Sequence, residues 1–348
     1  MSSAKHAMLL ALVVVVSLCL VPCVEAQDDK WSFVFTPQLW MANISENGFA
    51  PPSRIGSTPF GATTIFQGVQ RNLAVIVSEQ SLDRGSSDPG SIFYPQWGGQ
   101  LAAQYRQWTI AAGAQYVSFE TNTTLTRNDS PAPFTCQFTN NGPGIPAFTP
   151  FSCNVLGFSN TGAGAVLGSE KIRTDRTDVD LILSYFIPDV IKDVMDVSIG
   201  GGFKWIRASG QRTLTNTPGN VTNLGFSNTL SPLQYIYADG RMSNTASFLD
   251  NFYGLTIPTS LSFQLTRDKK WLLPVTMVPF LGYERQDDQV NGVKTAFAYG
   301  GTFDAGVRYV FDNGVALYAG YRAQVIQGVE RYFAQGPLFN MSVRFGGR

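Results

Sequence analysis

The sequence predicts an all-β fold, a transmembrane antiparallel up-and-down β-barrel of about 12 strands (10–14), with short periplasmic turns and long extracellular loops. Three observations lead to this prediction. Apolar and polar residues alternate with a period of two, charged residues are scarce, and short and long links between the expected strands alternate along the chain. Because only helices and closed barrels can span a membrane, alternation without a spanning helix favours the barrel.

The first 26 residues are typical of a signal peptide. Lys5 and His6 give the charged start, residues 7–21 the apolar run, and Val24-Glu25-Ala26 the small-residue cleavage site. We therefore assign 1–26 to a signal peptide and 27–348 to the barrel, and expect export to the outer membrane. The chain has 25 basic and 25 acidic residues, so removing Lys5 and Glu25 leaves 24 of each (25 − 1 = 24) and no net charge.

The expected mature chain contains no histidine, because His6 is the only one in the sequence. It can therefore form neither a Ser-His-Asp nor a Cys-His site, and no His-ligated metal centre. We expect no enzyme, no catalytic residues, no metal and no cofactor. The absence of a basic surplus argues against a nucleic-acid partner.

Charged residues make up 14% of the chain, against about 25% in soluble domains. The chain is long enough to bury a large core but has few charges with which to cover one, which indicates an outer surface that does not meet water. The longest apolar run after residue 26, 271–283, is shorter than the roughly 20 residues of a spanning helix, and Pro274 and Pro279 interrupt it.

Alternation is clearest in the segments 297–311 and 315–325, which Asp312-Asn313-Gly314 separates. Asn and Gly accept the positive φ that a tight hairpin turn requires. Keeping both apolar sets on one face places Phe311 opposite Val315, with Gly314 in the left-handed region. The same pairing places Asp304 opposite Arg322 and leaves Arg308 without an acid opposite it.

Twelve strands are expected, and the links between them fall into two classes. The short links are 68–71, 107–108, 188–195, 267–270 and 312–314, and the longer ones are 45–57, 83–96, 120–171, 208–248, 285–296 and 326–337. Short turns at one end and long loops at the other are typical of outer-membrane barrels. The expected strands are 31–44, 58–67, 72–82, 97–106, 109–119, 172–187, 196–207, 249–266, 271–284, 297–311, 315–325 and 338–345.

The segments 298–309 and 318–322, with the Asp-Asn-Gly turn between them, resemble the closing strands of Gram-negative outer-membrane porin-like proteins. The opening segment 31–37 is similar to a first strand of that class. The resemblance implies an architecture rather than a substrate. Such proteins often end on an aromatic residue, whereas Phe345 is followed by Gly346-Gly347-Arg348 here.

Two groups of residues are the candidate sites of such a barrel. Aromatic residues beside the short turns are expected to form an interfacial girdle, although packing in a soluble core is the alternative. Charges on the face opposite the apolar one are expected to point into the lumen, where they either tune a polar pore or pair with one another to stabilise the wall. The girdle residues are Trp108, Trp271, Tyr309 and Phe311, and the lumen-facing charges are Arg106, Asp178, Asp180, Lys204, Glu284, Asp304, Arg308, Arg322 and Arg344.

Cys136 and Cys153 are the two cysteines of the expected mature chain, and an even pair in an oxidising compartment predicts a disulfide. Two thiols alone would lack the further ligands of a metal site. Asp178 and Asp180 share one strand face, as paired carboxylates of a glycosidase could. Ion pairing with the nearby Arg173 and Arg176 explains them more simply.

The resulting hypothesis is an outer-membrane barrel, either a porin-like channel for small polar solutes or ions, or a structural component of the membrane. Its expected partners are outer-membrane lipid and those solutes, and its oligomeric state stays open. The alternative from another class is a soluble secreted β-sandwich that recognises carbohydrate.

Overall fold

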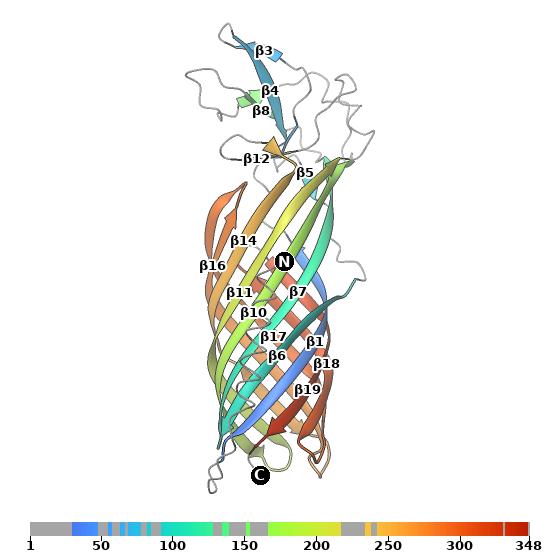
Figure 1. Ribbon diagram of the computed structural model, residues 1–348, viewed down its shortest axis with the longest axis vertical. Coiled ribbons are helices and arrows are strands. Elements are labelled where there is room, and N and C mark those ends of the chain that lie inside the picture. The colour runs from blue at the N-terminus through green and yellow to red at the C-terminus, as the bar shows by residue number, and fades with distance from the viewer. Residues whose placement is uncertain are drawn as a thin grey trace.

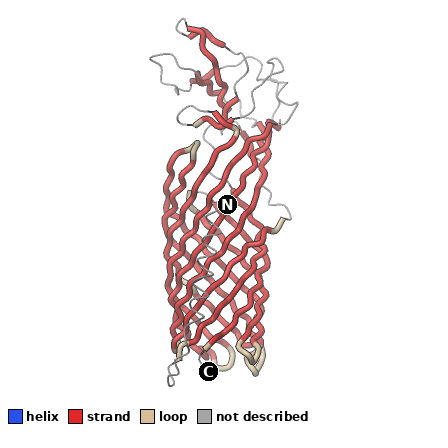
Figure 2. The backbone as a smooth tube through the Cα atoms, in the orientation of Figure 1, coloured by secondary structure: helices blue, strands red, loops and turns tan. Residues whose placement is uncertain are grey.

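The computed structural model describes residues 30–47, 55–57, 63–66, 69–77, 82–84, 92–127, 134–138, 151–153, 166–216, 234–237, 242–329 and 331–346. These residues form strands, turns and loops (Figure 2). Among them, no helix is long and apolar enough to cross a membrane.

The main sheet closes into a barrel of ten antiparallel strands (Figure 1). It contains twelve strand segments, but β14 and β15 are two parts of one wall strand and the short β5 (Leu82–Arg84) only adds to β7, which leaves 12 − 2 = 10. Because one sheet closes on itself, the β-sandwich alternative is wrong. In ring order the wall strands are β1 (Ser32–Asn47), β6 (Tyr94–Tyr105), β7 (Trp108–Arg127), β10 (Val166–Ile191), β11 (Met195–Asn216), β14 (Thr245–Thr256) with β15 (Thr259–Gln264), β16 (Trp271–Asp288), β17 (Gly292–Val310), β18 (Val315–Gln327) and β19 (Arg331–Phe345).

A second sheet is built from strands within three long links between wall strands. It lies beyond one end of the barrel (Figure 1). The expected wall strands 58–67 and 72–82 were wrong, because β3 and β4 pair inside this sheet and not with the wall. The second sheet consists of β2 (Ile55–Ser57), β3 (Thr63–Phe66), β4 (Val69–Val77), β8 (Phe134–Phe138), β9 (Phe151–Cys153), β12 (Gln234–Ile236) and β13 (Met242–Ser243).

The two ends of the barrel differ in their connections. At the turn end the hairpins turn at residues 106–107, 192–194, 265–270 and 311–314. At the loop end lie the long links 48–93, 128–165 and 217–244. The expected long loops 285–296 and 326–337 were wrong, because β16 passes to β17 through residues 289–291 and β18 to β19 through 328–330.

The β17–β18 hairpin has the expected register. The amide of Phe311 donates to the Val315 carbonyl at 2.8 Å, and Gly314 has φ of 83°. Asp304 is paired with Arg322, and Arg308 with Tyr318, as predicted. A three-residue turn with glycine in the left-handed region therefore sets which residues of the two strands share a face.

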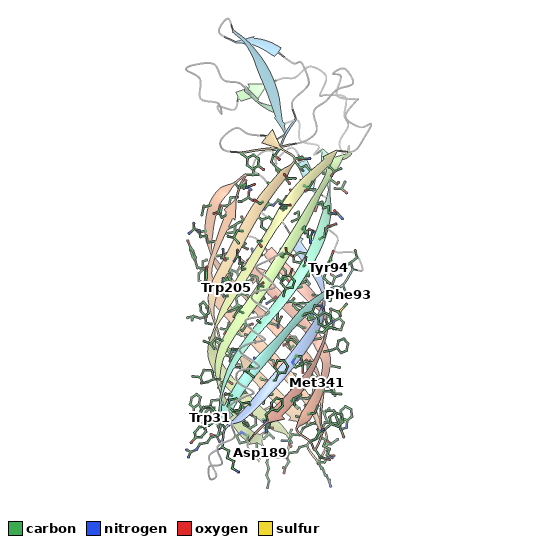
Figure 3. The ribbon with its side chains drawn as sticks, in the orientation of Figure 1. Trp31, Phe93, Tyr94, Asp189, Trp205 and Met341 are labelled. Carbon is green, nitrogen blue, oxygen red and sulfur yellow. The ribbon has the colours of Figure 1, made fainter. Side chains whose placement is uncertain are left out.

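Two rows of aromatic residues encircle part of the outer wall. Near the turn end, Trp271 lies 4.7 Å from Tyr309 between ring centroids, and Trp108 lies 4.9 Å from Tyr185. The other row, here called the loop-end girdle, crosses adjacent strands as Trp205, Tyr253, Tyr283 and Phe297. Figure 3 shows Trp205 well above Trp31 and Asp189, which lie at the turn end.

The separation of the rows matches a membrane. Trp271 and Tyr283 are 12 residues apart on β16 (283 − 271 = 12), with outward Leu273, Met277 and Leu281 between them. At about 3.4 Å per residue and a tilt near 40°, this corresponds to roughly 31 Å along the barrel axis, close to the ~30 Å hydrocarbon core. A closed barrel with an apolar band between aromatic girdles is an outer-membrane-type barrel.

The wall continues beyond the loop-end girdle. On β10, 13 residues separate Val166 from Val179, which is paired with Trp205 of the girdle (179 − 166 = 13). The outward side chains Lys171, Arg173 and Asp175 of this stretch are exposed and charged. This part of the wall therefore stands in water, above the lipid.

Candidate functional site in the barrel lumen

The structure places eight of the nine predicted lumen charges on inner positions of the wall. Arg106 is the exception. It lies in the two-residue turn between β6 and β7, exposed, with φ of 53° and its guanidinium carbon 5.5 Å from the Tyr105 ring centroid. Its assignment to the lumen was wrong, because the tight turn begins before residue 106 can occupy the next inner position of the strand.

A central ion network of Arg176, Asp178, Asp180 and Lys204 lies on β10 and β11. Arg176 donates to both oxygens of Asp178, at 2.7 and 3.0 Å. The Lys204 ammonium lies 3.0 Å from Asp180 and 3.6 Å from Asp178. The side chains of Arg176 and Asp178 are 3% and 2% exposed, so the charges are held in a nearly dry interior. The expected pairing with Arg176 is confirmed, whereas Arg173 points outward and is exposed.

This network spans the lumen. The guanidinium of Arg176 donates to Oε1 of Gln324 on β18 at 3.3 Å, and it lies 3.7 Å from the ring centroid of Tyr332 on β19. In a ring of ten wall strands, β10 and β18 are five steps apart in either direction, and so lie on opposite sides. Arg176 therefore bridges the two walls of the barrel.

The predicted Asp304–Arg322 pair lies beside this bridge. Arg322 donates to the two carboxylate oxygens of Asp304 at 2.7 and 2.8 Å, which is the two-pronged geometry of a strong charge-assisted pair. Its guanidinium carbon lies 5.5 Å from the Trp40 ring centroid. Around it, buried apolar side chains from several wall strands form one cluster, which includes Trp40, Phe252, Phe280 and Leu338.

A second closure lies at the loop end. Tyr235 and Tyr237, which come from the long link 217–244, pack with Leu125, Leu214 and Val290 of the rim. The Tyr235 hydroxyl donates to Oε1 of Glu170 at 2.5 Å. These two tyrosines were missed in the sequence, because nothing local shows that a loop residue will fold back into the mouth of a barrel.

Further charges lie near the mouth of the barrel. Arg212 and Asp288, each 1% exposed at the side chain, are 2.9 Å apart. The carboxylate of the predicted lumen residue Glu284 accepts a hydrogen bond from the Val329 amide at 2.7 Å. The region from Asp180 to these residues is here called the loop-end lumen, and its inner side chains are mostly large and buried.

The lumen below is lined differently. In this turn-end lumen, hydroxyls of adjacent strands meet, with Thr276 donating to Ser260 at 3.0 Å and Thr36 to Ser342 at 3.1 Å. Arg344 donates to Gln104 at 2.9 Å. Arg308 has no ion-pair partner among the described residues, as its place opposite Tyr318 predicts. The partly exposed inner side chains here include Gln100, Ser184, Ser198, Ser260, Ser262, Thr276 and Arg308.

The other predicted site residues can also be placed. All four expected girdle residues lie beside turn-end hairpins, and Trp108, Trp271 and Phe311 are exposed. Cys136 is paired with Phe151, and Cys153 with Phe134, on the adjacent strands β8 and β9. The cysteines are thus diagonal neighbours, whose Cα atoms are about 7–8 Å apart, more than the 4.4–6.8 Å that a disulfide spans. The disulfide stays a prediction, and it requires this pairing to shift.

The carboxylates of the central ion network are held by cations and are poorly placed for acid–base catalysis. Asp178 and Asp180 both face cations, so neither carboxylate is placed as a free acid or base. Among the described residues, no group of three or more His, Cys, Asp or Glu is arranged to hold a metal. The absence of enzymatic activity stays a prediction.

No protein-family model matches the chain, and no curated protein resembles it in sequence. Solved structures with some likeness include the outer membrane protease OmpT from Escherichia coli, at 9% identity and a TM-score of 0.44, covering 93% of this chain and 99% of that one. A Pseudomonas aeruginosa FadL homologue has 10% identity and a TM-score of 0.31, covering 91% and 90%. The toluene transporter TodX of Pseudomonas putida has 9% identity and a TM-score of 0.22, covering 91% and 90%. At these values the likenesses carry no argument about function.

Proposed function

We propose that this protein is a non-conducting outer-membrane anchor, which holds the sheet built from its long links at the cell surface. The observation that carries the proposal is the Arg176 bridge from β10 to Gln324 and Tyr332 on the opposite wall. Side chains that meet across the lumen obstruct a path for ions there, which supports the proposal. The packed cluster of Tyr235 and Tyr237 at the mouth supports the same conclusion.

The wall above the membrane supports the display role. The β7, β10 and β11 strands are 20, 26 and 22 residues long, whereas about 9–11 tilted residues cross a bilayer. The excess extends the barrel away from the lipid and carries the second sheet with it. The buried ion pairs and the apolar cluster then act as a core that keeps this tall tube rigid.

An epitope inserted at residues 139–150, within the link between β8 and β9, tests the display role. An antibody should stain intact cells that carry this insertion. The matched control has the same epitope in the turn at Asp268 and should stain cells only after the outer membrane is permeabilised. Staining of intact cells by the control alone would mean that the orientation is reversed and would refute the proposal.

The porin-like channel for small polar solutes or ions is the second candidate. The turn-end lumen favours it, because several inner side chains there, among them Ser262 and Thr276, are small, polar and partly exposed. A channel would require Arg176 and Arg322 to leave their partners and open the loop-end lumen. Liposome swelling in small sugars distinguishes the two, since an anchor should behave as empty liposomes do.

A further inference from the structure

On five adjacent strands of the outer wall, an apolar row is followed toward the loop end by a polar row. The last apolar row is Val179, Trp205, Tyr253, Tyr283 and Phe297, which are directly paired from β10 through β11, β14 and β16 to β17. Two residues further toward the loop end, every member of the row is polar. This polar row is Thr177, Arg207, Asn251, Arg285 and Thr295.

The polar row carries two cations and no acid. Arg207 and Arg285 are exposed and are separated by the single strand of Asn251, which places their Cα atoms about 10 Å apart at the usual strand spacing. Arginine side chains are long enough to converge from this distance on one group. No described residue forms a hydrogen bond or ion pair with either guanidinium, whereas exposed Lys171 pairs with Glu120 at 2.6 Å.

No described acid forms an ion pair with either of these two arginines. Asp175 and Asp287 occupy the next row toward the loop end, opposite Ser209 and Leu249 rather than opposite either arginine. Asp175 accepts a hydrogen bond from the Tyr116 hydroxyl at 2.9 Å. The side of the row that faces the membrane has no acid at all, because it is the loop-end girdle.

We infer that Arg207, Asn251 and Arg285 bind the phosphorylated headgroup of a lipid in the leaflet at the loop end. Guanidinium groups match the planar, two-pronged geometry of phosphate oxygens, and the Asn251 amide adds a donor between them. A lipid fits better than free phosphate because the site lies directly over Trp205 and Tyr253, where the acyl chains of the same molecule meet aromatic rings. Figure 3 shows Trp205 on the outer wall at this level.

Because Trp205 lies next to the proposed site, its fluorescence can report lipid binding there. The full-length protein is reconstituted into phosphatidylcholine vesicles that contain a minority of either brominated phosphatidic acid or brominated phosphatidylcholine, and tryptophan quenching is recorded. Quenching should show a preference for the anionic lipid of about tenfold or more, as expected for charge-assisted contacts. The variant W205F should lose most of the lipid-specific quenching.

The double variant R207Q/R285Q should lose this preference and still fold, as shown by heat-modifiable migration. The matched control K192Q/R267Q removes two exposed cations from turn-end hairpins and should keep it. Equal losses in both variants would mean that the preference for the anionic lipid depends only on net charge, and would overturn the proposal. An absence of preference in the wild type would also overturn it. So would displacement of the lipid by millimolar inorganic phosphate, since that would identify a site for free phosphate.

Discussion

The two halves of the lumen are built from the same ten strands but in opposite ways. In the loop-end lumen the inner residues are mostly large or charged, and Arg176, Asp178 and Phe280 are nearly inaccessible. In the turn-end lumen several are small and polar, and Ser260, Ser262 and Thr276 are partly exposed. Strand number alone therefore does not decide whether a barrel is open. Inner side-chain volume and pairing decide it at each level.

Removing a charged residue should change the free energy of unfolding by different amounts in the two halves of the lumen. An ion pair in a dry interior is costly to break, because the remaining charge is stranded without water. Arg308 has no ion-pair partner among the described residues, so its removal leaves no opposite charge stranded. Arg176 and Arg308 are the matched pair for this comparison.

The largest effect is expected for R176A. Removing the guanidinium leaves Asp178 buried with only Lys204 at 3.6 Å, which should destabilise the barrel by about 3–5 kcal/mol. The measurement is denaturant unfolding in detergent micelles. R308A should change stability much less than R176A, because Arg308 has no ion-pair partner in the part of the chain that the structure describes. Equal effects of the two substitutions would show that the halves do not differ in hydration.

Arginine substitutions compare the two faces of the wall and then the two halves. F303R places a cation among lipid tails and should cost about 2–4 kcal/mol near mid-membrane, whereas L317R lies level with the girdle residue Tyr309 and should cost less. S262R enters the turn-end lumen and should be mild. T302R should be harmful although it is inner, because the Thr302 hydroxyl accepts a hydrogen bond from Gln324 at 3.4 Å in the loop-end lumen. Insertion yield and heat-modifiable migration report all four, and a harmless F303R would refute the outward assignment.

Single cysteines can compare solvent access directly. In a C136S/C153S background, S262C should react readily with a water-soluble maleimide, whereas T174C should stay unmodified until the protein unfolds. Thr174 is fully buried, and Ser262 is partly exposed. Rapid labelling of T174C in the folded protein would mean that water reaches the loop-end lumen, and the contrast between the halves would fail.

The smallest effect is expected at the turn-end rim, outside the lumen. The Thr266 hydroxyl and the Lys270 amide donate to Asp268 and lower the pKa of its carboxyl from 3.8. A lowered pKa means that the ionised form stabilises the fold above pH 3.8, and that this contribution is lost as pH falls through the folded value. D268N should therefore lower stability slightly at neutral pH, and this loss should shrink as pH falls below 3.8. An NMR titration of Asp268 at or above 3.8 would contradict the assignment.

The alternation of residues predicts the inner and outer faces of the wall well inside the membrane. Asp304 and Arg322 were paired from the sequence alone, because a three-residue turn fixes the register of two strands whose apolar faces must both meet lipid. The eight inner charges follow from the same rule. The rule holds wherever one face meets lipid and the other does not.

The rule fails above the loop-end girdle. Outward Arg173 and inner Thr174 are both polar there, because the outer face meets water, so the strand loses its pattern and resembles a loop. This explains why the predicted strands ended too early. The predicted links 120–171, 208–248, 285–296 and 326–337 were correspondingly too long. The cross-lumen contact of Arg176 with Tyr332 could not be predicted either, because it joins strands on opposite sides of the ring.

Conductance across planar bilayers tests most directly whether the loop-end lumen closes the barrel. If the proposed anchor role is right, the purified wild-type protein should insert and show no steps of conductance, because the Arg176 bridge and the Asp304–Arg322 pair would obstruct the lumen. Regular steps from the wild-type protein would contradict this account. They would favour the porin-like channel, in which removing Arg308 and Arg322 together should shift ion preference toward cations.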